Sequence, residues 1–252
     1  MPSRRVRLVL GLVLSGLCAG YLIYAGLFYA QQRRLLYLPT HQATAPDLAP
    51  WLVGGQLTGY SRESVAPQAV WLILQGNAGQ AGPRGYFQQV PPTESLYILE
   101  YPGYGRREGE PTRDTVDAAA IAAYRELRRR FPRVYVGVVG ESFGSGPACG
   151  LTRESPAPDS LTLFVPLART DLIIGRFVPL LPMRWLLRDN WDNVAALRGY
   201  SGPVTIFAAE NDEVIPREHT LLLAGSVPGV RLVWLPGGHV GHSESPLVRL
   251  AR

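Results

Sequence analysis

Lysine is absent from the 252-residue sequence, so all 25 of its basic residues are arginine. We interpret this bias as a property of the source genome, and it favours a bacterial origin. Cysteine is also scarce: Cys18 lies in an apolar N-terminal run and Cys149 lies in the body of the chain. Two cysteines in such different segments predict no disulfide framework, and they do not indicate the redox compartment.

Acidic residues are missing from the first 34 positions, which carry Arg4, Arg5, Arg7, Arg33 and Arg34. These five arginines account for the whole net charge of +5, because the other 20 arginines are matched by 20 carboxylates. A neutral body offers no basic surface to phosphates, so we exclude nucleic acid as a partner. The length and the 46% hydrophobic content fit one globular domain with a sizeable core.

The N-terminal arginines flank a run of 23 uncharged residues from Leu8 to Ala30. A helix of that length rises about 1.5 Å per residue and crosses a hydrocarbon layer of ~30 Å. The alternative is a cleaved signal peptide, but the best small-residue pattern, Cys18-Ala19-Gly20, lies inside the run. We therefore predict an N-terminal segment with a single transmembrane anchor over residues 1–34 and a globular domain over residues 35–252.

The arginines around this run also predict its orientation. Three arginines precede the run and two follow it. The positive-inside tendency places the N-terminus in the cytoplasm and the globular domain outside it. For a bacterial protein this predicts a domain on the periplasmic side of the inner membrane.

Apolar runs closed by Gly, Pro or an acid recur after an irregular neck at 39–51; they span 69–76, 95–105, 133–142, 160–168, 203–212 and 230–238. Such runs are typical of strands buried on both faces of a parallel sheet. Between the second and third runs, apolar residues at helical spacing follow Thr112 and Asp114, either of which can cap a helix. The alternation predicts an α/β fold with a mostly parallel, doubly wound sheet and crossover helices.

The third run ends in Gly140-Glu141-Ser142-Phe143-Gly144. The alternative interpretation of this sequence is a glycine-rich turn capped by serine. However, a buried strand precedes the motif and the helix-compatible segment 146–154 follows it, which is the context of a nucleophile elbow. We therefore predict that Ser142 occupies a strained turn that only small neighbours allow.

A nucleophilic serine needs a base, and the base needs a carboxylate that orients it. Asp212 lies at the end of the fifth run, and His239 directly follows the sixth. Both positions are at carboxyl ends of strands, on the edge where Ser142 emerges. The order Ser, Asp, His is the one expected for an α/β-hydrolase.

Other residues compete for these roles. Glu210 and Glu213 flank Asp212, and His242 follows His239. We favour Asp212 because it directly precedes the turn "EVIP", and His239 because it lies closer to its strand. A metal site built from His219, His239 and His242 is the further alternative, but no cysteine or paired acid completes a ligand set. We predict no metal and no cofactor.

The reaction also needs hydrogen-bond donors for the oxyanion. The backbone N–H of Phe143 is one expected donor, because it follows the nucleophile. The turn "LQGNAG" after the first apolar run supplies Asn77 and Ala78 as candidates for the second.

Seven segments together carry a family resemblance: "LLYLPT", "LQGNAG", "EYPGYGRREGEPT", "GESFGSGPA", "LLRDNWDN", "NDEVIP" and "GGHVGH". In order and spacing, from Leu35 onward, the chain resembles the membrane-anchored α/β-hydrolase domain-containing serine hydrolases, a branch that includes protein depalmitoylases. The resemblance implies Ser142, Asp212 and His239 as the triad. It also implies a departure, because the family usually has histidine where this chain has Gln75.

Residues and resemblance together predict a serine hydrolase that cleaves carboxylic esters or thioesters of acylated small molecules, lipids or proteins. An acyltransferase would use the same acyl-enzyme, so it stays an alternative. A membrane-tethered binding protein on a hydrolase scaffold is the alternative from another class.

The segment 170–193, "TDLIIGRFVPLLPMRWLLRDNWDN", has more apolar residues than one helix face needs. It is a candidate cap over the active site that would favour apolar acyl chains. Ordinary core of a crossover helix, broken by Pro179 and Pro182, is the alternative. The last ten residues leave room for a short final helix.

Overall fold

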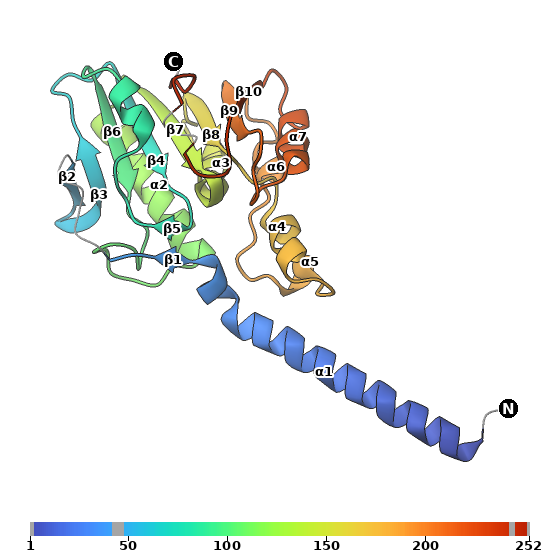
Figure 1. The fold of residues 1–252 in the computed structure, drawn as a ribbon. Coiled ribbons are helices and arrows are strands. Elements are labelled where there is room, and N and C mark those ends of the chain that lie inside the picture. Colours follow the sequence, from blue (N-terminus) through green and yellow to red (C-terminus); the bar gives the residue numbers. More distant parts are fainter. Residues whose placement is uncertain (1–2, 42–47, 242–244, 251–252) are drawn as a thin grey trace.

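A computed structural model describes residues 3–41, 48–241 and 245–250. Its centre is an eight-stranded sheet in the order β10-β9-β8-β7-β4-β6-β3-β2 (Figure 1). Six neighbouring strands run parallel. They are β4 (Ala69–Leu74), β6 (Glu94–Leu99), β7 (Tyr135–Glu141), β8 (Ser160–Phe164), β9 (Val204–Ala209) and β10 (Arg231–Leu235). These strands match the six apolar runs, so the predicted mostly parallel sheet is confirmed.

The other edge of the sheet is an antiparallel hairpin of β2 (Ala49–Val53) and β3 (Gln56–Arg62). Gly54 and Gly55 connect the two strands with φ values of +59° and +80°, as a two-residue hairpin turn requires. The ring of Trp51 packs edge-to-face against the ring of Tyr97, with 4.9 Å between the ring centroids. The predicted irregular neck is therefore wrong at residues 49–51, while residues 42–47 lie outside the described ranges.

Helices cover one face of the sheet: α2 (Arg113–Arg130), α3 (Ser145–Gly150), α6 (Asn193–Ala196) and α7 (Arg217–Gly225). Of the two predicted caps of α2, Thr112 is the N-cap, and its hydroxyl accepts the N–H of Thr115 at 3.1 Å. Side chains alternate along β4, so that Leu72 faces this helical layer and Trp71 faces a second core.

The second core is closed by the 3₁₀ helix Gly85–Gln89 and by the C-terminal segment. Val248 of that segment is fully buried. The predicted final helix is wrong for residues 245–250, which form a turn closed by a hydrogen bond from Val248 N–H to the Ser245 carbonyl. Burial of Val248 against the sheet holds the segment in place without a helix.

The N-terminal helix α1 (Arg4–Leu36) extends away from the globular body (Figure 1). It has 33 residues and a window of mean hydropathy 2.1, so by length and composition it can cross a membrane. Directly after it, β1 (Leu38–Pro39) pairs in parallel with β5 (Ala78–Gly79). Helices α4 (Thr170–Phe177) and α5 (Met183–Leu186) lie on the side of the body from which α1 leaves.

Candidate active site

Ser142 lies in a sharp turn between β7 and α3 and has φ of +50°, a left-handed conformation that is strained for serine. Its neighbours must be glycine for steric reasons. A Cβ on Gly144 would lie 2.1 Å from the carbonyl oxygen of Leu74, and one on Gly140 would lie 2.7 Å from the Cβ of Ala148. The predicted elbow conformation and its need for small neighbours are therefore present.

His239 and Asp212 meet Ser142 at the carboxyl edge of the sheet. The Oγ atom of Ser142 lies 2.9 Å from Nε2 of His239. On the other side of the ring, Nδ1 of His239 lies 2.9 Å from Oδ2 and 3.0 Å from Oδ1 of Asp212. This chain of hydrogen bonds can take a proton from the serine and stabilise the resulting imidazolium.

The carboxylate of Asp212 is held in its ionised form. Burial, the largest influence, acts to raise its pKa. The hydrogen bond from His239 and the backbone N–H groups of Ile215 (2.7 Å) and Val214 (2.9 Å) outweigh burial, so the pKa lies below its ordinary value. An ionised Asp212 is the partner that a positively charged His239 needs.

The competing residues occupy other places. Oε2 of Glu213 accepts the backbone N–H of His239 at 3.1 Å, so this acid contacts the histidine but not its ring. Glu210 is exposed at the end of β9, and His219 is buried on α7. His242 lies outside the described residues. Within the ranges that the structure describes, no three histidine, cysteine or acidic side chains are grouped as metal ligands.

The candidate oxyanion loop lies against the nucleophile. A Cβ on Gly76 would be 3.8 Å from the Cβ of Ser142. Asn77 and Phe143 line the same cavity as Ser142, while Ala78 is paired in β5. The side-chain amide of Asn77 donates to the carbonyl of Leu36 at 2.8 Å. Donors to an oxyanion would therefore come from backbone N–H groups.

Sequence reasoning missed a buried polar network behind this loop. The amide of Gln75 donates to Glu100 at 3.3 Å and accepts from Arg84 at 3.4 Å. Arg84 also pairs with Glu141 at 2.6 Å, and Tyr86 donates to the other oxygen of Glu141 at 2.8 Å. The network connects the oxyanion loop to the residue before the nucleophile. The acids in "GESFG" and "LEYPG", both at strand ends, are the sequence signal for it.

A cavity of about 430 Å³ opens at Ser142. Most of its lining side chains are apolar, and helices α4 and α1 contribute half of them. Helix α4 contributes Thr170, Ile173, Ile174 and Phe177, and helix α1 contributes Phe28, Gln32, Leu35 and Leu36. The sequence predicts α1 only as a membrane anchor. In a helix that is apolar on all sides, the sequence does not show which residues line a pocket in the globular domain and which face lipid.

Comparisons with known proteins agree with this architecture. No family model matches the chain. An uncharacterized protein of Mycobacterium tuberculosis (strain H37Rv) is 27% identical over 238 residues, covering 87% of this chain and 83% of its own length. Lysophosphatidylserine lipase ABHD12 from Danio rerio is 26% identical over 178 residues, which cover 62% of this chain and 47% of that protein. The overlap with the lipase is thus limited to about half of its length.

Among solved structures, Pyrococcus furiosus esterase Pf2001 superposes with a TM-score of 0.60 at 15% identity, covering 81% of this chain and 90% of that chain. At this identity the likeness establishes the fold. The predicted α/β-hydrolase fold is confirmed, and the Danio rerio relative supports the branch that the motifs indicated.

Proposed function

Because the chain has the α/β-hydrolase fold, we propose that it is a membrane-anchored serine hydrolase that cleaves carboxylic esters or thioesters through an acyl-enzyme on Ser142. The observation that carries the proposal is the hydrogen-bonded chain from Ser142 Oγ through His239 to Asp212. The names of two similar proteins, a lysophosphatidylserine lipase and an esterase, are consistent with ester chemistry.

In the first half-reaction, Oγ of Ser142 attacks the acyl carbon while Nε2 of His239 takes the hydroxyl proton. The oxygen of the tetrahedral intermediate carries the negative charge, and the backbone N–H groups of Phe143 and of the loop at Asn77 and Ala78 are the proposed donors to it. The C–O or C–S bond then breaks, and the leaving group takes the proton from His239. The acyl group stays on Ser142.

In the second half-reaction, His239 removes a proton from water, and the hydroxide oxygen attacks the acyl carbon. Collapse of the second intermediate returns the proton to Ser142 Oγ and releases the carboxylic acid. Asp212 stays ionised throughout and holds Nδ1–H of His239, which its lowered pKa supports.

The domain organisation belongs to the same proposal. Residues 1–34 form the cytoplasmic N-terminus and the anchor, and residues 35–252 form the catalytic domain with the cap segment 170–193. The domain works on the periplasmic side of a bacterial inner membrane. Its partners are an acylated small-molecule, lipid or protein substrate and the membrane that α1 crosses. The length and mean hydropathy of α1 support the anchor.

A fluorophosphonate probe tests the proposal, because it phosphonylates only an activated serine. We expect one labelled serine in the detergent-solubilised protein, Ser142, and no labelling of Ser142→Ala. The labelled protein should also have lost p-nitrophenyl ester turnover. A correctly folded protein that neither reacts with the probe nor cleaves esters would be a binding scaffold, and the proposal would be wrong.

A further inference from the structure

We propose that the mouth of the active-site cavity opens inside the membrane leaflet, so that a long acyl chain held in the bilayer reaches Ser142 sideways along α1. This inference rests on the proposed serine hydrolase function. It extends that function by naming the substrate class, a bilayer-embedded acyl chain, and by giving the anchor helix a binding role. Five sets of observations carry it.

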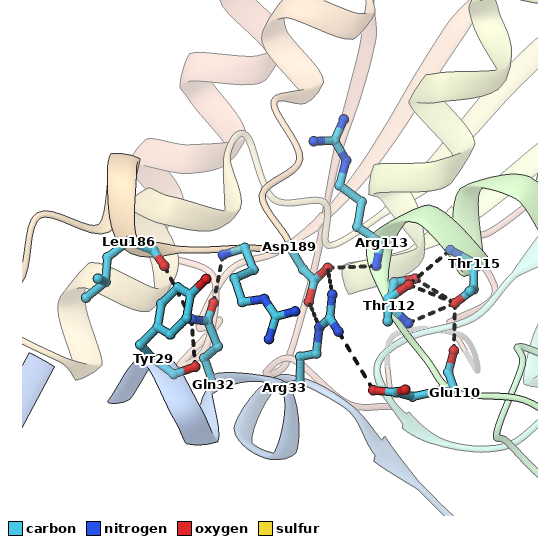
Figure 2. Close-up of polar contacts among 10 residues, drawn as sticks. Tyr29, Gln32, Arg33, Glu110, Thr112, Arg113, Thr115, Leu186 and Asp189 are labelled. Carbon is cyan, nitrogen blue, oxygen red and sulfur yellow. Dashed lines mark hydrogen bonds and ion pairs between the residues drawn. The ribbon is translucent and has the colours of Figure 1, made fainter. Parts of the chain in front are cut away.

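The end of α1 is fixed to the cap segment by a buried glutamine (Figure 2). Gln32 is 3% exposed. Its amide donates to the carbonyls of Leu186 at 3.3 Å and Tyr29 at 3.1 Å, and its oxygen accepts the N–H of Arg188 at 2.7 Å. Two of these hydrogen bonds therefore join α1 to Leu186 at the end of α5 and to Arg188 just after it, and the third stays within α1.

An ion pair in the next position extends the junction to α2 (Figure 2). Nε of Arg33 lies 2.8 Å from Oδ2 of Asp189, a residue that is 2% exposed. Oδ1 of Asp189 accepts the backbone N–H of Arg113 in the first turn of α2 at 2.9 Å. Because Asp189 contacts both helices, the last turn of α1 is a fixed part of the domain and not a loose tether.

The tip of the cap segment runs back along the apolar part of α1. The hydroxyl of Tyr21 donates to the carbonyl of Leu180 at 3.0 Å, and that of Tyr24 donates to the carbonyl of Pro179 at 3.2 Å. Tyr21 precedes Arg33 by 12 residues, which is about 18 Å of helix. If Arg33 lies at the membrane surface, the tip reaches well into a hydrocarbon layer of ~30 Å.

The tip itself has the side chains of a membrane-inserted loop. Phe177 is 63% exposed, Leu180 is 85% exposed and Trp185 is 82% exposed. Leu180 also has φ of +69°, a strained conformation for leucine, and it lies between two prolines that restrict the loop. In water these side chains would form an unfavourable apolar patch, whereas in a leaflet they have apolar neighbours.

The mouth of the cavity lies where α1 and the cap segment face each other. Leu35 and Phe177 both line the cavity, and each is 63% exposed, which places them at its opening. Phe28 is buried in a small cluster with Leu181, Met183 and Leu187 and forms the wall behind the mouth. An acyl chain that leaves the leaflet here stays in contact with apolar side chains until its carbonyl meets Ser142.

Membrane depth is the first test. In a Cys18→Ser background, where the remaining Cys149 is buried, Leu180→Cys and Val65→Cys are each labelled with a nitroxide and reconstituted in phosphatidylcholine vesicles. Val65 is fully exposed in the loop before β4, at the sheet edge opposite Ser142. We expect the label at 180 to collide mainly with oxygen and the label at 65 mainly with a water-soluble nickel chelate. Equal accessibility of both labels to the nickel chelate would overturn the inference.

Chain length is the second test, with two neighbouring residues of α1 as a matched pair. Phe28 lines the cavity, whereas Leu27 is 62% exposed and does not. In vesicles, kcat/KM for p-nitrophenyl esters should rise from acetate to at least octanoate, because each additional CH₂ of the acyl chain buries more apolar surface in the cavity. Phe28→Ala should lower the octanoate-to-acetate ratio by about tenfold, Phe28→Leu should restore most of it, and Leu27→Ala should leave it unchanged.

The outcomes separate this inference from the proposed function. A preference for acetate, or equal ratios for the Phe28 and Leu27 variants, would overturn the binding role of α1 while probe labelling of Ser142 remained. Loss of both ester turnover and labelling in the wild type would instead contradict the hydrolase function. The nitroxide measurement decides the membrane placement in either case, because it requires no activity.

Discussion

Ser142 depends on its neighbours for both its geometry and its reactivity. Glycines at 140 and 144 permit the turn. A Cβ at position 140 would collide with α3, and one at position 144 would collide with the backbone at the end of β4. His239, the proposed base, places its Nε2 atom 2.9 Å from Oγ of Ser142. The left-handed φ of the serine is strained by about 1–3 kcal/mol, which the surrounding β7 and α3 must offset.

Removing either member of the pair should abolish turnover. We expect Ser142→Ala and His239→Ala each to lower kcat/KM by at least ~10³-fold, because the members of a triad act as a unit. Thermal unfolding of both variants should stay close to that of the wild type. His242→Ala is the control and should have a far smaller effect; if the two histidine variants exchanged their behaviour, His239 would not be the base.

Glu100 is a buried carboxyl whose protonation should affect stability. It is fully buried, one of its oxygens accepts the Ala81 N–H and the Gln75 amide, and the other has no hydrogen-bond partner among the residues that the structure describes. Burial is the largest influence and raises its pKa above the ordinary value of 4.5. The folded protein therefore holds this proton at pH values where the unfolded chain has lost it.

The consequence is a stability contribution that exists at low pH and disappears as pH rises. The unfolding free energy of the wild type, measured relative to that of Glu100→Gln, should fall as the pH increases from 4.5, the ordinary pKa of a glutamate, through the raised pKa of Glu100 in the folded protein. Urea unfolding in detergent at several pH values measures it, with the exposed Glu108→Gln as the control. A difference that grew with pH would mean that Glu100 is stabilised in its ionised form.

At the scale of elements, the main finding is that α1 and the segment 170–193, the proposed cap, form one packed unit with the globular domain. The segment 170–193 contains two short helices interrupted by Pro179 and Pro182, as expected for a chain that cannot form one long helix. Its contacts with α1 replace the internal contacts that a longer helix would have. The position of the cap should therefore depend on a few residues near the end of α1.

Gln32 and its neighbour Gln31 allow this dependence to be measured. Gln32→Ala removes hydrogen bonds to Leu186 and Arg188, whereas the adjacent Gln31 is exposed. Losing these hydrogen bonds weakens the contact between α1 and the segment 170–193 by about 1.4 kcal/mol or more. The fraction of molecules in which this segment is detached from α1 should therefore rise about tenfold. Limited trypsin digestion should cleave after Arg184 correspondingly faster in Gln32→Ala and at the wild-type rate in Gln31→Ala. Equal rates in both variants would show that the cap does not depend on α1.

At the scale of the whole molecule, topology follows from α1. We expect a reporter fused after Arg252 to be active only outside the cytoplasm, because the three arginines just before Leu8 outnumber the two just after Ala30, Arg33 and Arg34. The protein should resist carbonate extraction and keep its first 30 residues. Mass spectrometry of the N-terminus provides the check, and a mature chain that begins after Gly20 would contradict the anchor.

Much of the fold could be predicted from local patterns. The six parallel strands follow from continuous apolar runs, and α2 follows from helical spacing behind Thr112. The hairpin of β2 and β3 was missed because its polar and small residues resemble a linker, although Gly54-Gly55 marks its turn. The final helix was predicted wrongly because Val248 gains more by packing on the sheet than a short terminal helix would gain from its own hydrogen bonds.

What the sequence determined by itself is the set of groups at one edge of the sheet. Ser142, Asp212 and His239 each follow an apolar strand, and parallel strands bring their carboxyl ends together whatever the rest of the chain does. Tertiary structure alone decided which atoms meet. It placed Asp212 on the ring of His239 and Glu213 on its backbone, and it made α1 a wall of the cavity. These contacts join residues 26 to more than 150 positions apart, and the periodicity of a single strand or helix carries no information about partners at such distances.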